Sequence, residues 1–254
     1  MDNEKELQQL RNRFRDLADK SFSRNMFTFT GFLGLSEQDV FWKMERELSH
    51  ARFALSGGAE GTDRKVVRFG NGDELGYEVD FPIVCIHIKP LMAKFADALS
   101  HRDFLGALMN LGIERSTLGD IRVGDKEAYL FCLDSIAEYI CDNLTQVKHT
   151  NVRCEVVESA AEVPQEEPER RLVQAASMRV DAVLAKVYNK SREDSLALFR
   201  AQKVFVDGRL CENNARQLKV GETVNARGYG KFRVVGEPKE TKKGRMAVEV
   251  EVFR

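Results

Sequence analysis

The sequence predicts an α+β protein with an N-terminal helical segment, a ferredoxin-like domain and a small C-terminal domain. Helical and strand periodicities alternate in the middle of the chain, an acidic stretch containing prolines interrupts them, and basic residues are concentrated after it. With 254 residues, of which 43% are hydrophobic, the chain can bury a core in several domains. We expect domains over residues 1–80, 81–157 and 178–254, and an acidic linker over residues 158–177.

The first 80 residues are predicted to be mainly helical. A helix opens near Ser36, and a short strand is expected over residues 65–69. Residues 56–61 are rich in glycine, which is one property of a phosphate-binding loop. However, the stretch lacks the Gly-Lys-Ser/Thr ending of such loops, and the carboxylate of Glu60 would repel phosphate. A tight turn is therefore the favoured interpretation.

Residues 81–157 are predicted to form a split βαβ, ferredoxin-like domain. Strand-forming runs flank two stretches in which apolar residues recur at helical spacing. The expected order is strand, helix, strand, strand, helix and strand, at residues 81–88, 103–111, 120–123, 128–133, 136–147 and 152–157. This order is typical of an antiparallel sheet with two crossover helices.

Residues 178–254 are predicted to form two helices on a small, twisted antiparallel sheet. Apolar residues at i, i+3, i+4 and i+7 from Val180 give the first helix one apolar stripe, and Ser191 can cap the second helix. Asp207-Gly208 favours a two-residue hairpin turn. Alternating apolar residues over 246–252 are expected to form the last strand, at an edge of the sheet.

Composition argues against several classes of protein. No run of apolar residues is long enough to span a membrane, and the charged N-terminus does not resemble a secretory signal, so we expect a cytosolic protein without membrane contact. The five cysteines include no Cys-x-x-Cys pair, and the four histidines lack metal-ligand spacing. We therefore expect buried or half-buried thiols, no disulfide framework, no metal and no cofactor.

Basic residues are concentrated in the C-terminal domain although the net charge of the chain is −1. Residues 178–254 hold 17 Lys and Arg against 10 Asp and Glu, a difference of +7. Residues 1–177 hold 22 against 30, a difference of −8. Clustered cations attract polyanions, so a nucleic acid is the favoured partner of the basic domain. A solvated basic face without a partner is the alternative.

Arg192 stands in the first turn of its predicted helix, where the helix dipole disfavours a cation. A phosphate bound to the free backbone N–H groups of residues 192–194 would offset this and could also meet the guanidinium. In the alternative, Arg192 pairs with Glu193 or Glu212 on the surface, which contributes little. Phosphate binding is the favoured interpretation.

The C-terminal domain resembles the alpha-L RNA-binding motif, a small domain found in the fourth small-subunit ribosomal protein, in tyrosyl-tRNA synthetases and in pseudouridine synthases. The matching stretches are Arg179-Val180-Asp181, Ser191-Arg192, residues 202–208 and Val220-Gly221-Glu222. The sequence departs from the motif at Val180, where Leu is common, and at Gln202, where Gly usually precedes the strand. The resemblance implies that Arg179, Ser191 and Arg192 contact the RNA backbone, with Lys203 nearby.

From about Phe27 onward the chain resembles the YlmH family of bacterial RNA-binding proteins. The resemblance rests on residues 101–108, 111–115, 119–121, 228–232 and 241–245. It implies a ribosome-associated factor that binds rRNA and tRNA on the large ribosomal subunit. It also implies a part in ribosome-associated quality control, in which the protein supports the elongation of tails on stalled nascent chains. The family's link to cell division is read as indirect.

The favoured mechanism is recognition of RNA without catalysis, with phosphates neutralised by a basic face. The expected RNA-binding residues are Arg179, Ser191, Arg192, Lys203, Arg209, Arg227, Lys231, Lys242, Lys243 and Arg245. A second RNA or ribosome contact is expected at Arg102, Arg115 and Arg122. Tyr229 and Phe232 are candidates for base stacking, although aromatic residues in a small sheet are more often part of the core.

No catalytic residue is assigned, and no small-molecule substrate is expected. His101 and Asp103 are two residues apart on a predicted helix and so do not face each other, and no nucleophile is tied to them. One rival interpretation is an RNA-modifying enzyme, either a methyltransferase or a pseudouridine synthase, that uses the C-terminal domain to bind its substrate. Another is an assembly protein that binds a protein partner through its acidic N-terminal half.

Overall fold

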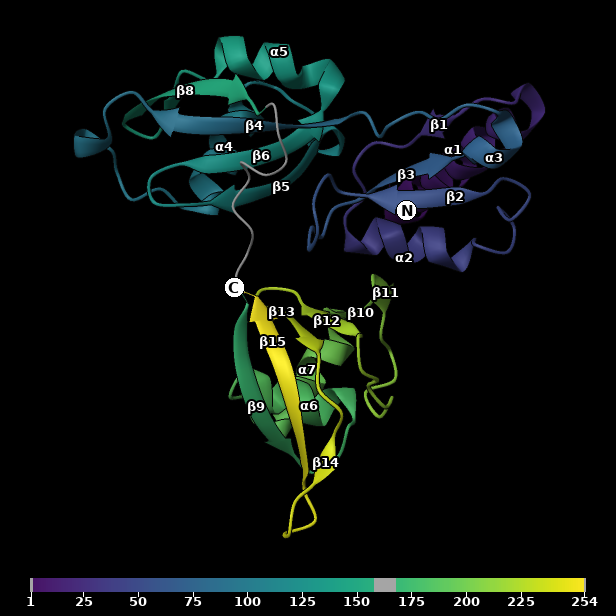
Figure 1. Ribbon diagram of the computed structural model, residues 1–254, viewed down its shortest axis with the longest axis vertical. Coiled ribbons are helices and arrows are strands. Elements are labelled where there is room, and N and C mark those ends of the chain that lie inside the picture. Colours follow the sequence, from purple (N-terminus) through teal and green to yellow (C-terminus); the bar gives the residue numbers. More distant parts are fainter. Residues whose placement is uncertain (1, 158–167, 254) are drawn as a thin grey trace. The chain divides into compact units, whose positions relative to one another are not determined.

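The computed structural model divides the chain into two compact units, Met1–Gln165 (unit 1) and Glu166–Arg254 (unit 2) (Figure 1). The structure describes residues 2–157 and 168–253. Each unit combines helices with antiparallel sheet, so the predicted α+β class is confirmed. The division falls within the predicted linker, of which residues 158–167 lie outside the described residues.

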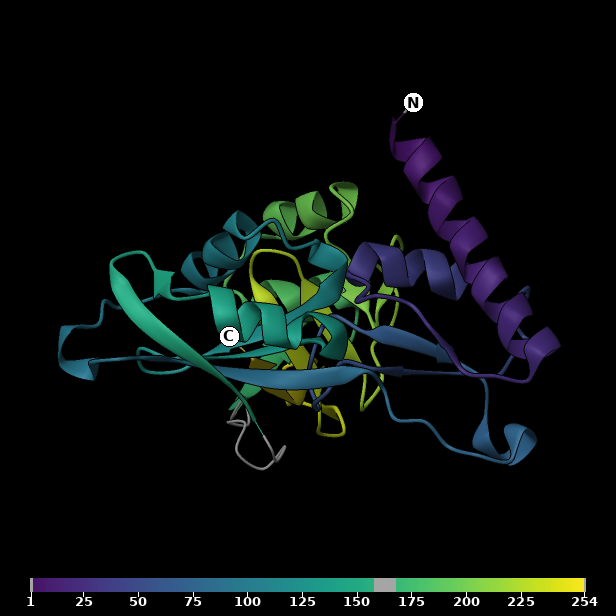
Figure 2. The same ribbon diagram turned by 90° about the horizontal axis from the view of Figure 1, so that it is seen from above.

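Over residues 2–80, helices pack against a three-stranded antiparallel sheet of order β1-β3-β2. The elements are α1 (Asp2–Arg24), β1 (Thr28–Phe29), α2 (Leu35–Lys43), β2 (Phe53–Ser56), β3 (Val66–Phe69) and α3 (Gly72–Leu75). Phe14 of α1 meets Phe41 of α2 edge to face, with ring centroids 5.6 Å apart, in a core that Phe69 of β3 completes. Figure 2 shows the N-terminal part of α1 extending beyond this core.

The prediction of a mainly helical N-terminal region is only partly right. The helix expected near Ser36 begins at Leu35, and the strand expected over residues 65–69 is β3. β1 and β2 were not predicted, because β1 has only two residues and the burial of β2 does not alternate. These strands form only by pairing with β3, so local periodicity does not show them.

Residues 83–156 form a five-stranded sheet of order β5-β6-β4-β8-β7, in which every paired strand is antiparallel. The elements are β4 (Ile83–Pro90), η1 (Ala93–Phe95), α4 (His101–Asn110), η2 (Arg115–Thr117), β5 (Leu118–Val123), β6 (Ala128–Leu133), α5 (Asp134–Asn143), β7 (Gln146–Val147) and β8 (Thr150–Val156). The order of the main elements is that of a split βαβ sandwich. Phe104 of α4 and Ile140 of α5 are buried against Ile86 and Leu130, so both helices cover the same face of the sheet.

The other face of this sheet is covered in part by the N-terminal segment of unit 1. Phe32 and Val66 are buried in one cluster with Cys85 of β4 and Phe131 of β6. A Cβ atom built on Gly119 would lie 2.7 Å from the ring of Phe32, so the contact requires glycine at this position. The two parts of unit 1 therefore share a packed interface.

Arg64 ties this interface together with hydrogen bonds to backbone carbonyls. Its guanidinium donates to the carbonyl oxygens of Phe32, Leu118 and Arg115, at 2.8, 2.8 and 3.1 Å. Its backbone N–H donates to the carboxylate of Asp120 at 3.1 Å. Burial, together with the nearby charge of Arg115, lowers the pKa of Arg64 to about 10. The stretch from Glu114 to Ile121, part of the resemblance noted above, therefore has a structural role.

Unit 2 packs two helices against one face of a seven-stranded sheet within residues 168–253. The elements are β9 (Glu169–Ala175), α6 (Val180–Val187), α7 (Arg192–Arg200), β10 (Val204–Val206), β11 (Arg209–Leu210), β12 (Thr223–Ala226), β13 (Gly230–Val234), β14 (Lys239–Glu240) and β15 (Met246–Phe253). The order is β11-β10-β12-β13-β15-β14, and β9 also pairs with β15. Leu184 of α6 and Phe199 of α7 share a buried core with Val224 and Phe232.

The predicted turns of unit 2 are confirmed by the backbone. Asp207 and Gly208 both have positive φ, 49° and 76°, as a two-residue hairpin turn requires between β10 and β11. Gln202, which stands where the alpha-L motif usually has Gly, also has positive φ, 54°. Glycine is common at such a position because it adopts this conformation without steric cost.

Two predictions for unit 2 are wrong. Residues 169–175, assigned to the linker 158–177, form β9, which pairs along its length with β15. The prediction failed because the local sequence is highly charged, and Val173 and Ala175 become buried only through that pairing. For the same reason β15 is not the edge strand that was expected: it lies between β13 on one side and β9 and β14 on the other.

Candidate nucleic-acid interface

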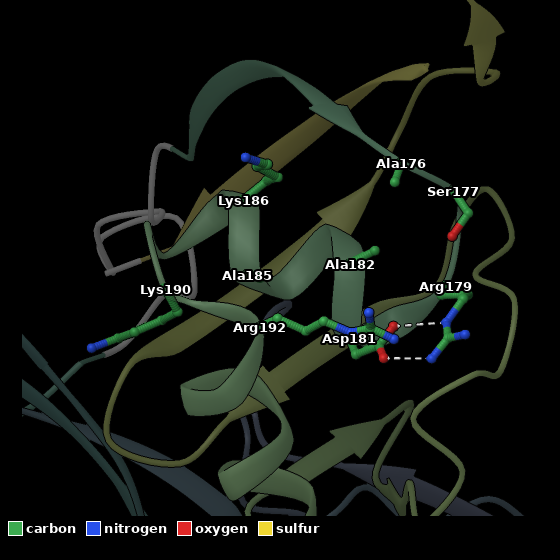
Figure 3. Close-up of a pocket in the computed structure, with 9 residues that line it drawn as sticks. All are labelled: Ala176, Ser177, Arg179, Asp181, Ala182, Ala185, Lys186, Lys190 and Arg192. Atoms are coloured by element: carbon green, nitrogen blue, oxygen red, sulfur yellow. Dashed lines mark hydrogen bonds and ion pairs between the residues drawn. The ribbon is translucent and has the colours of Figure 1, made fainter. Parts of the chain in front are cut away.

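The loop before α6 and the helices α6 and α7 enclose a pocket of about 350 Å³, called the α6–α7 pocket (Figure 3). Its lining residues are Ala176, Ser177, Arg179, Asp181, Ala182, Ala185, Lys186, Lys190 and Arg192. The apolar stripe of α6 faces the core of unit 2, which leaves the opposite side of the helix for the pocket. Three alanines in the lining keep the backbone of this region open to close approach, while four cations surround it.

Arg179 and Asp181 form a two-bond ion pair at one end of the pocket. Arg179 Nη2 lies 2.6 Å from Asp181 Oδ2 and Nε lies 3.0 Å from Oδ1, as Figure 3 shows. Asn214 also donates to Asp181 Oδ2 at 2.6 Å, and the hydroxyl of Ser195 donates to the Asp181 carbonyl at 2.9 Å. Burial opposes the charge of Asp181, but the hydrogen bonds from Arg179 and Asn214 hold its pKa below the ordinary value.

This network changes the expected role of Arg179. The alpha-L resemblance assigns it to RNA contact, yet its guanidinium is bound to a carboxylate that is only 5% exposed. Its side chain is one-third exposed, so one edge can still face a ligand. Arg179 therefore first positions α6 and the loop that carries Asn214.

The start of α7 is more fully capped than the sequence analysis assumed. The hydroxyl oxygen of Ser191 accepts a hydrogen bond from the backbone N–H of Asp194 at 3.1 Å, and the Asp194 carboxylate accepts one from the same hydroxyl at 2.7 Å. The N–H of Asp194 is therefore not free for a phosphate. Glu193 and Asp194 also offset the helix dipole that disfavours Arg192. The expected anion site reduces to the side chain of Arg192 and the first N–H groups of the helix.

Three cations of the α6–α7 pocket have no carboxylate partner among the described residues: Lys186, Lys190 and Arg192. The proposed surface pairs of Arg192 with Glu193 or Glu212 are not formed. Lys190 Nζ lies 4.4 Å from the centroid of the Tyr229 ring, a cation–π contact, and Tyr229 is 43% exposed. The pocket therefore combines unpaired positive charge with an exposed aromatic ring at its border.

Lys186 and Lys190 were not among the residues predicted from the sequence. Lys186 lies off the apolar stripe of α6, and Lys190 stands between α6 and α7, two residues before Arg192, so their closeness in sequence could have grouped them with Arg192. Phe232, a candidate for stacking, is fully buried and belongs to the core. Of the two aromatic candidates, only Tyr229 is available to a ligand.

The other predicted cations of unit 2 do not join this pocket in one patch. Lys203 is exposed after α7, and Arg227 lies over the ring of Phe205 with 5.4 Å between guanidinium and centroid. Lys231 contacts Phe253 in the same way at 5.4 Å. Figure 1 shows β11, which begins with Arg209, and the turn after β14 at opposite ends of unit 2. That turn and the residue after it carry three predicted residues, Lys242, Lys243 and Arg245.

The three residues of the second predicted contact, in unit 1, differ in their hydrogen-bond partners. Arg115 donates to the carbonyl oxygens of Leu118 and Gly119 at 2.6 and 3.3 Å, and burial lowers its pKa. Arg122 donates to the carbonyl of Glu60 and lies over the ring of Phe131. Both are engaged within unit 1. Arg102 is exposed on α4.

The remaining predictions concern the cysteine thiols, metal binding and membrane contact. The prediction of buried or half-buried thiols is confirmed, because burial covers Cys85, Cys132 and Cys211 and partly covers Cys141 and Cys154. Burial also raises the pKa of Cys132 to about 12, which leaves it a weak nucleophile. In the part of the chain that the structure describes, no group of three His, Cys, Asp or Glu side chains could hold a metal ion. No helix there is both long and apolar enough to cross a bilayer.

Part of unit 1 is similar to a known protein family. Residues 77–161, which include the sheet with α4 and α5, match the family model described as "Putative RNA-binding domain in YlmH". In this stretch the chain is similar to the YlmH family. The family model covers unit 1 only, so it does not describe the α6–α7 pocket.

Two known proteins are similar to this chain beyond that stretch. Over 223 residues it is 27% identical to the ribosome-associated protein quality control protein P2 of Bacillus subtilis, covering 87% of this chain and 86% of the relative. Because unit 1 ends at residue 165, a match of this extent continues into unit 2. The solved structure of the cell division protein ylmH from Streptococcus pneumoniae superposes with a TM-score of 0.50 at 19% identity. It covers 63% of this chain and 95% of that one, and shows a shared fold.

Proposed function

We propose that the protein binds rRNA and tRNA on the large ribosomal subunit through the α6–α7 pocket, without catalysing a reaction. The observation that carries this proposal is the group of unpaired cations at Lys186, Lys190 and Arg192. Cations without carboxylate partners can each neutralise a phosphate, and RNA binding gains affinity from the counterions released. The alanines of the lining let a sugar-phosphate chain approach α6 closely.

The proposed setting is ribosome-associated quality control in the cytoplasm. The B. subtilis relative is named as a quality control protein associated with the ribosome, and its match spans most of both chains. By this analogy the protein supports the elongation of tails on stalled nascent chains. It would do so by holding RNA in place, since folded RNA is recognised mainly through its shape and backbone.

The chemistry of the pocket favours binding over catalysis. Asp181 is the only carboxylate in the lining of the α6–α7 pocket. Its lowered pKa and its bonds to Arg179 and Asn214 keep it ionised and occupied. A general base works best with a pKa near the working pH and with a free oxygen, and Asp181 offers neither.

Cosedimentation with purified large ribosomal subunits at increasing salt tests the proposal. The variant Lys186→Gln/Lys190→Gln/Arg192→Gln should lose cosedimentation at salt concentrations where the wild type is retained. A matched control removes three exposed cations of α1 by changing Arg11, Arg13 and Lys20 to Gln. The control should behave as the wild type. Equal loss in both variants, or no loss in the pocket variant, would contradict the proposal.

The absence of catalysis needs its own measurement. Ribosomal RNA and tRNA are incubated with the protein, with and without a methyl donor, and their nucleosides are analysed by mass spectrometry. We expect no new methylated nucleoside and no new pseudouridine. Either product would favour the RNA-modifying enzyme and overturn this part of the proposal.

A further inference from the structure

A second cavity, of about 520 Å³, opens on the helix side of the sheet in unit 1. It lies between α4 and the turn that joins α5 to β7, and we call it the α4–β7 groove. Arg102 and Lys148 bring positive charge to its lining, and Asn110, Asn143 and Gln146 bring carboxamides. Carboxamides can donate and accept hydrogen bonds at the same time, as recognition of a nucleobase edge requires.

Within residues 77–161, this groove contains a cation, Arg102, that has no partner among the described residues. The region carries 8 Lys and Arg against 13 Asp and Glu, so it attracts RNA only where a cation is left available. Most of its cations are committed: Lys89 to Glu155, Lys126 to the Ala93 carbonyl, and Arg115 and Arg122 to carbonyls of unit 1. Among the described residues, Arg102 alone of these eight has no hydrogen-bond or ion-pair partner.

Gly106 of α4, which lines this groove, has a low helix propensity. It lies in the middle of α4, where glycine is a poor helix former. A Cβ atom built on it would meet nothing within 4 Å, and its φ is not in the left-handed region. Neither packing within the chain nor backbone conformation therefore requires glycine. Close approach of a ligand to the helix backbone would require it.

Lys148, which also lines the groove, has a backbone conformation that is unfavourable for lysine. It occupies the turn between β7 and β8 with a φ of 52°, a conformation that Asn or Gly adopts more easily. Its Nζ lies 3.0 Å from Asp103 Oδ1, so the turn holds an amine at the groove. Hydrogen bonds from Ser100 and then from Lys148 lower the pKa of Asp103 to about 2. Positions that violate local preference often mark a functional site.

The opposite face of the sheet is a poorer platform for RNA. Phe131, on the central strand β6, is covered by the N-terminal segment of unit 1 and is 2% exposed. Tyr129 stacks on His87 with ring centroids 4.4 Å apart and is 8% exposed. His87 in turn contacts Glu127 at 2.9 Å. These aromatic rings are occupied by other side chains, so bases cannot stack on them.

We propose that the α4–β7 groove binds an unstacked nucleotide of single-stranded RNA, with the phosphate at Arg102, the sugar close to Gly106, and the base edge at the carboxamides. The proposal rests on the proposed RNA-binding function and adds a second contact, in the other unit. A base inside a duplex is stacked and cannot enter the groove, so the groove selects single strands and loops.

The variant Gly106→Ala in the full chain separates binding from folding. Alanine improves the helix without a clash, so the thermal unfolding midpoint should rise by about 2–4 °C. The added methyl group occupies space that the sugar would use. Fluorescence anisotropy should therefore show affinity for a short mixed-sequence single-stranded RNA weakened on the order of tenfold. Affinity for an RNA duplex of the same length should not change.

The variant Arg102→Gln removes the cation of the groove that has no partner among the described residues. It should fold as well as the wild type and lower the salt dependence of single-strand binding by a slope of about 0.7. The matched control is Arg153→Gln, which removes an exposed cation of β8 near the paired side chains of the opposite face. The control should bind single strands as the wild type does.

The outcomes distinguish nucleotide binding in the α4–β7 groove from RNA binding at the α6–α7 pocket. If Gly106→Ala binds single strands as the wild type does while the triple variant of the α6–α7 pocket does not, the groove proposal fails and the proposed function stands. If both bind normally, both fail. If Gly106→Ala loses ribosome association but keeps its RNA affinity, the groove binds a protein, and the nucleotide proposal is overturned.

Discussion

The basic side chains at the centre of unit 1 are hydrogen-bonded to oxygen atoms of the protein itself, whereas three of the four cations that line the α6–α7 pocket of unit 2 have no carboxylate partner among the described residues. Arg64 donates to three backbone carbonyls, and Arg115 donates to two. Lys186 and Arg192 have no such partners among the described residues. Basic residues therefore stabilise the fold at the centre of unit 1 and remain available to a ligand in the pocket of unit 2.

This difference shows that pairing, more than the number of cations, decides which basic residues can bind a polyanion. A guanidinium that satisfies carbonyls stabilises the fold and is not available to a phosphate. An unpaired cation at a pocket contributes little to stability and remains available. Substitutions of the paired cations at the centre of unit 1 should therefore change stability and leave affinity unchanged, and substitutions of the unpaired cations in the α6–α7 pocket should do the reverse.

The largest expected effect is that of Arg64→Ala in unit 1. The carbonyl oxygens of Phe32 and Arg115 lose the Arg64 donor, and that of Leu118 keeps only Arg115, which should lower the free energy of unfolding by about 3–5 kcal/mol. Urea unfolding followed by the fluorescence of Trp42, the single tryptophan, measures this in unit 1. The control Arg52→Ala breaks an exposed pair with Glu74 and should cost less than about 1 kcal/mol. Equal losses in the two variants would remove Arg64 from its structural role.

A smaller effect is expected at the ion pair of unit 2, where Asp181→Asn should cost about 2 kcal/mol at neutral pH. The folded-state pKa of Asp181 lies below its ordinary value of 3.8, so its charge stabilises the fold above about pH 4. That contribution is lost as the pH falls through the lowered pKa. Thermal unfolding of both proteins should show a difference that shrinks below about pH 4. A difference that stays constant with pH would contradict the ionic role of Asp181.

The smallest stability effect tests the packing of unit 1 without changing any charge. Gly119→Ala places a methyl group against the ring of Phe32 and should cost about 1–3 kcal/mol. Gly124→Ala is the control, because the atom nearest to its Cβ, at 3.3 Å, belongs to the flexible side chain of Glu127. Trp42 fluorescence again reports the unfolding. If Gly119→Ala is as stable as the control, the interface is looser than described.

Elements with strong local periodicity could be predicted from the sequence, and elements that depend on pairing could not. β6 and α6 lie where the pattern of apolar residues placed them, because one buried face fixes each pattern. β9 was taken for a linker, since its charges hide the two residues that β15 buries. Pairing between distant segments is a tertiary property that local sequence does not contain.

The candidate site shows the same limit. Family resemblance pointed to Arg179 and Arg192, and both line the α6–α7 pocket. The sequence could not show that Asp181 holds Arg179, nor that Arg115 is bound to carbonyls while Lys186 is unpaired. The partners of a charged side chain come from the whole fold. Charge counting therefore found the basic unit but not the pocket.

The salt dependence of RNA binding by Arg192→Ala tests the central claim most directly. The logarithm of the association constant for a hairpin RNA is measured against the logarithm of the salt concentration, for the wild type and for the variant. We predict weaker binding and a slope lower by about 0.7–0.9, which corresponds to the loss of one phosphate contact. A folded Arg192→Ala protein with unchanged affinity and slope would contradict the claim that the unpaired cations of unit 2 bind RNA.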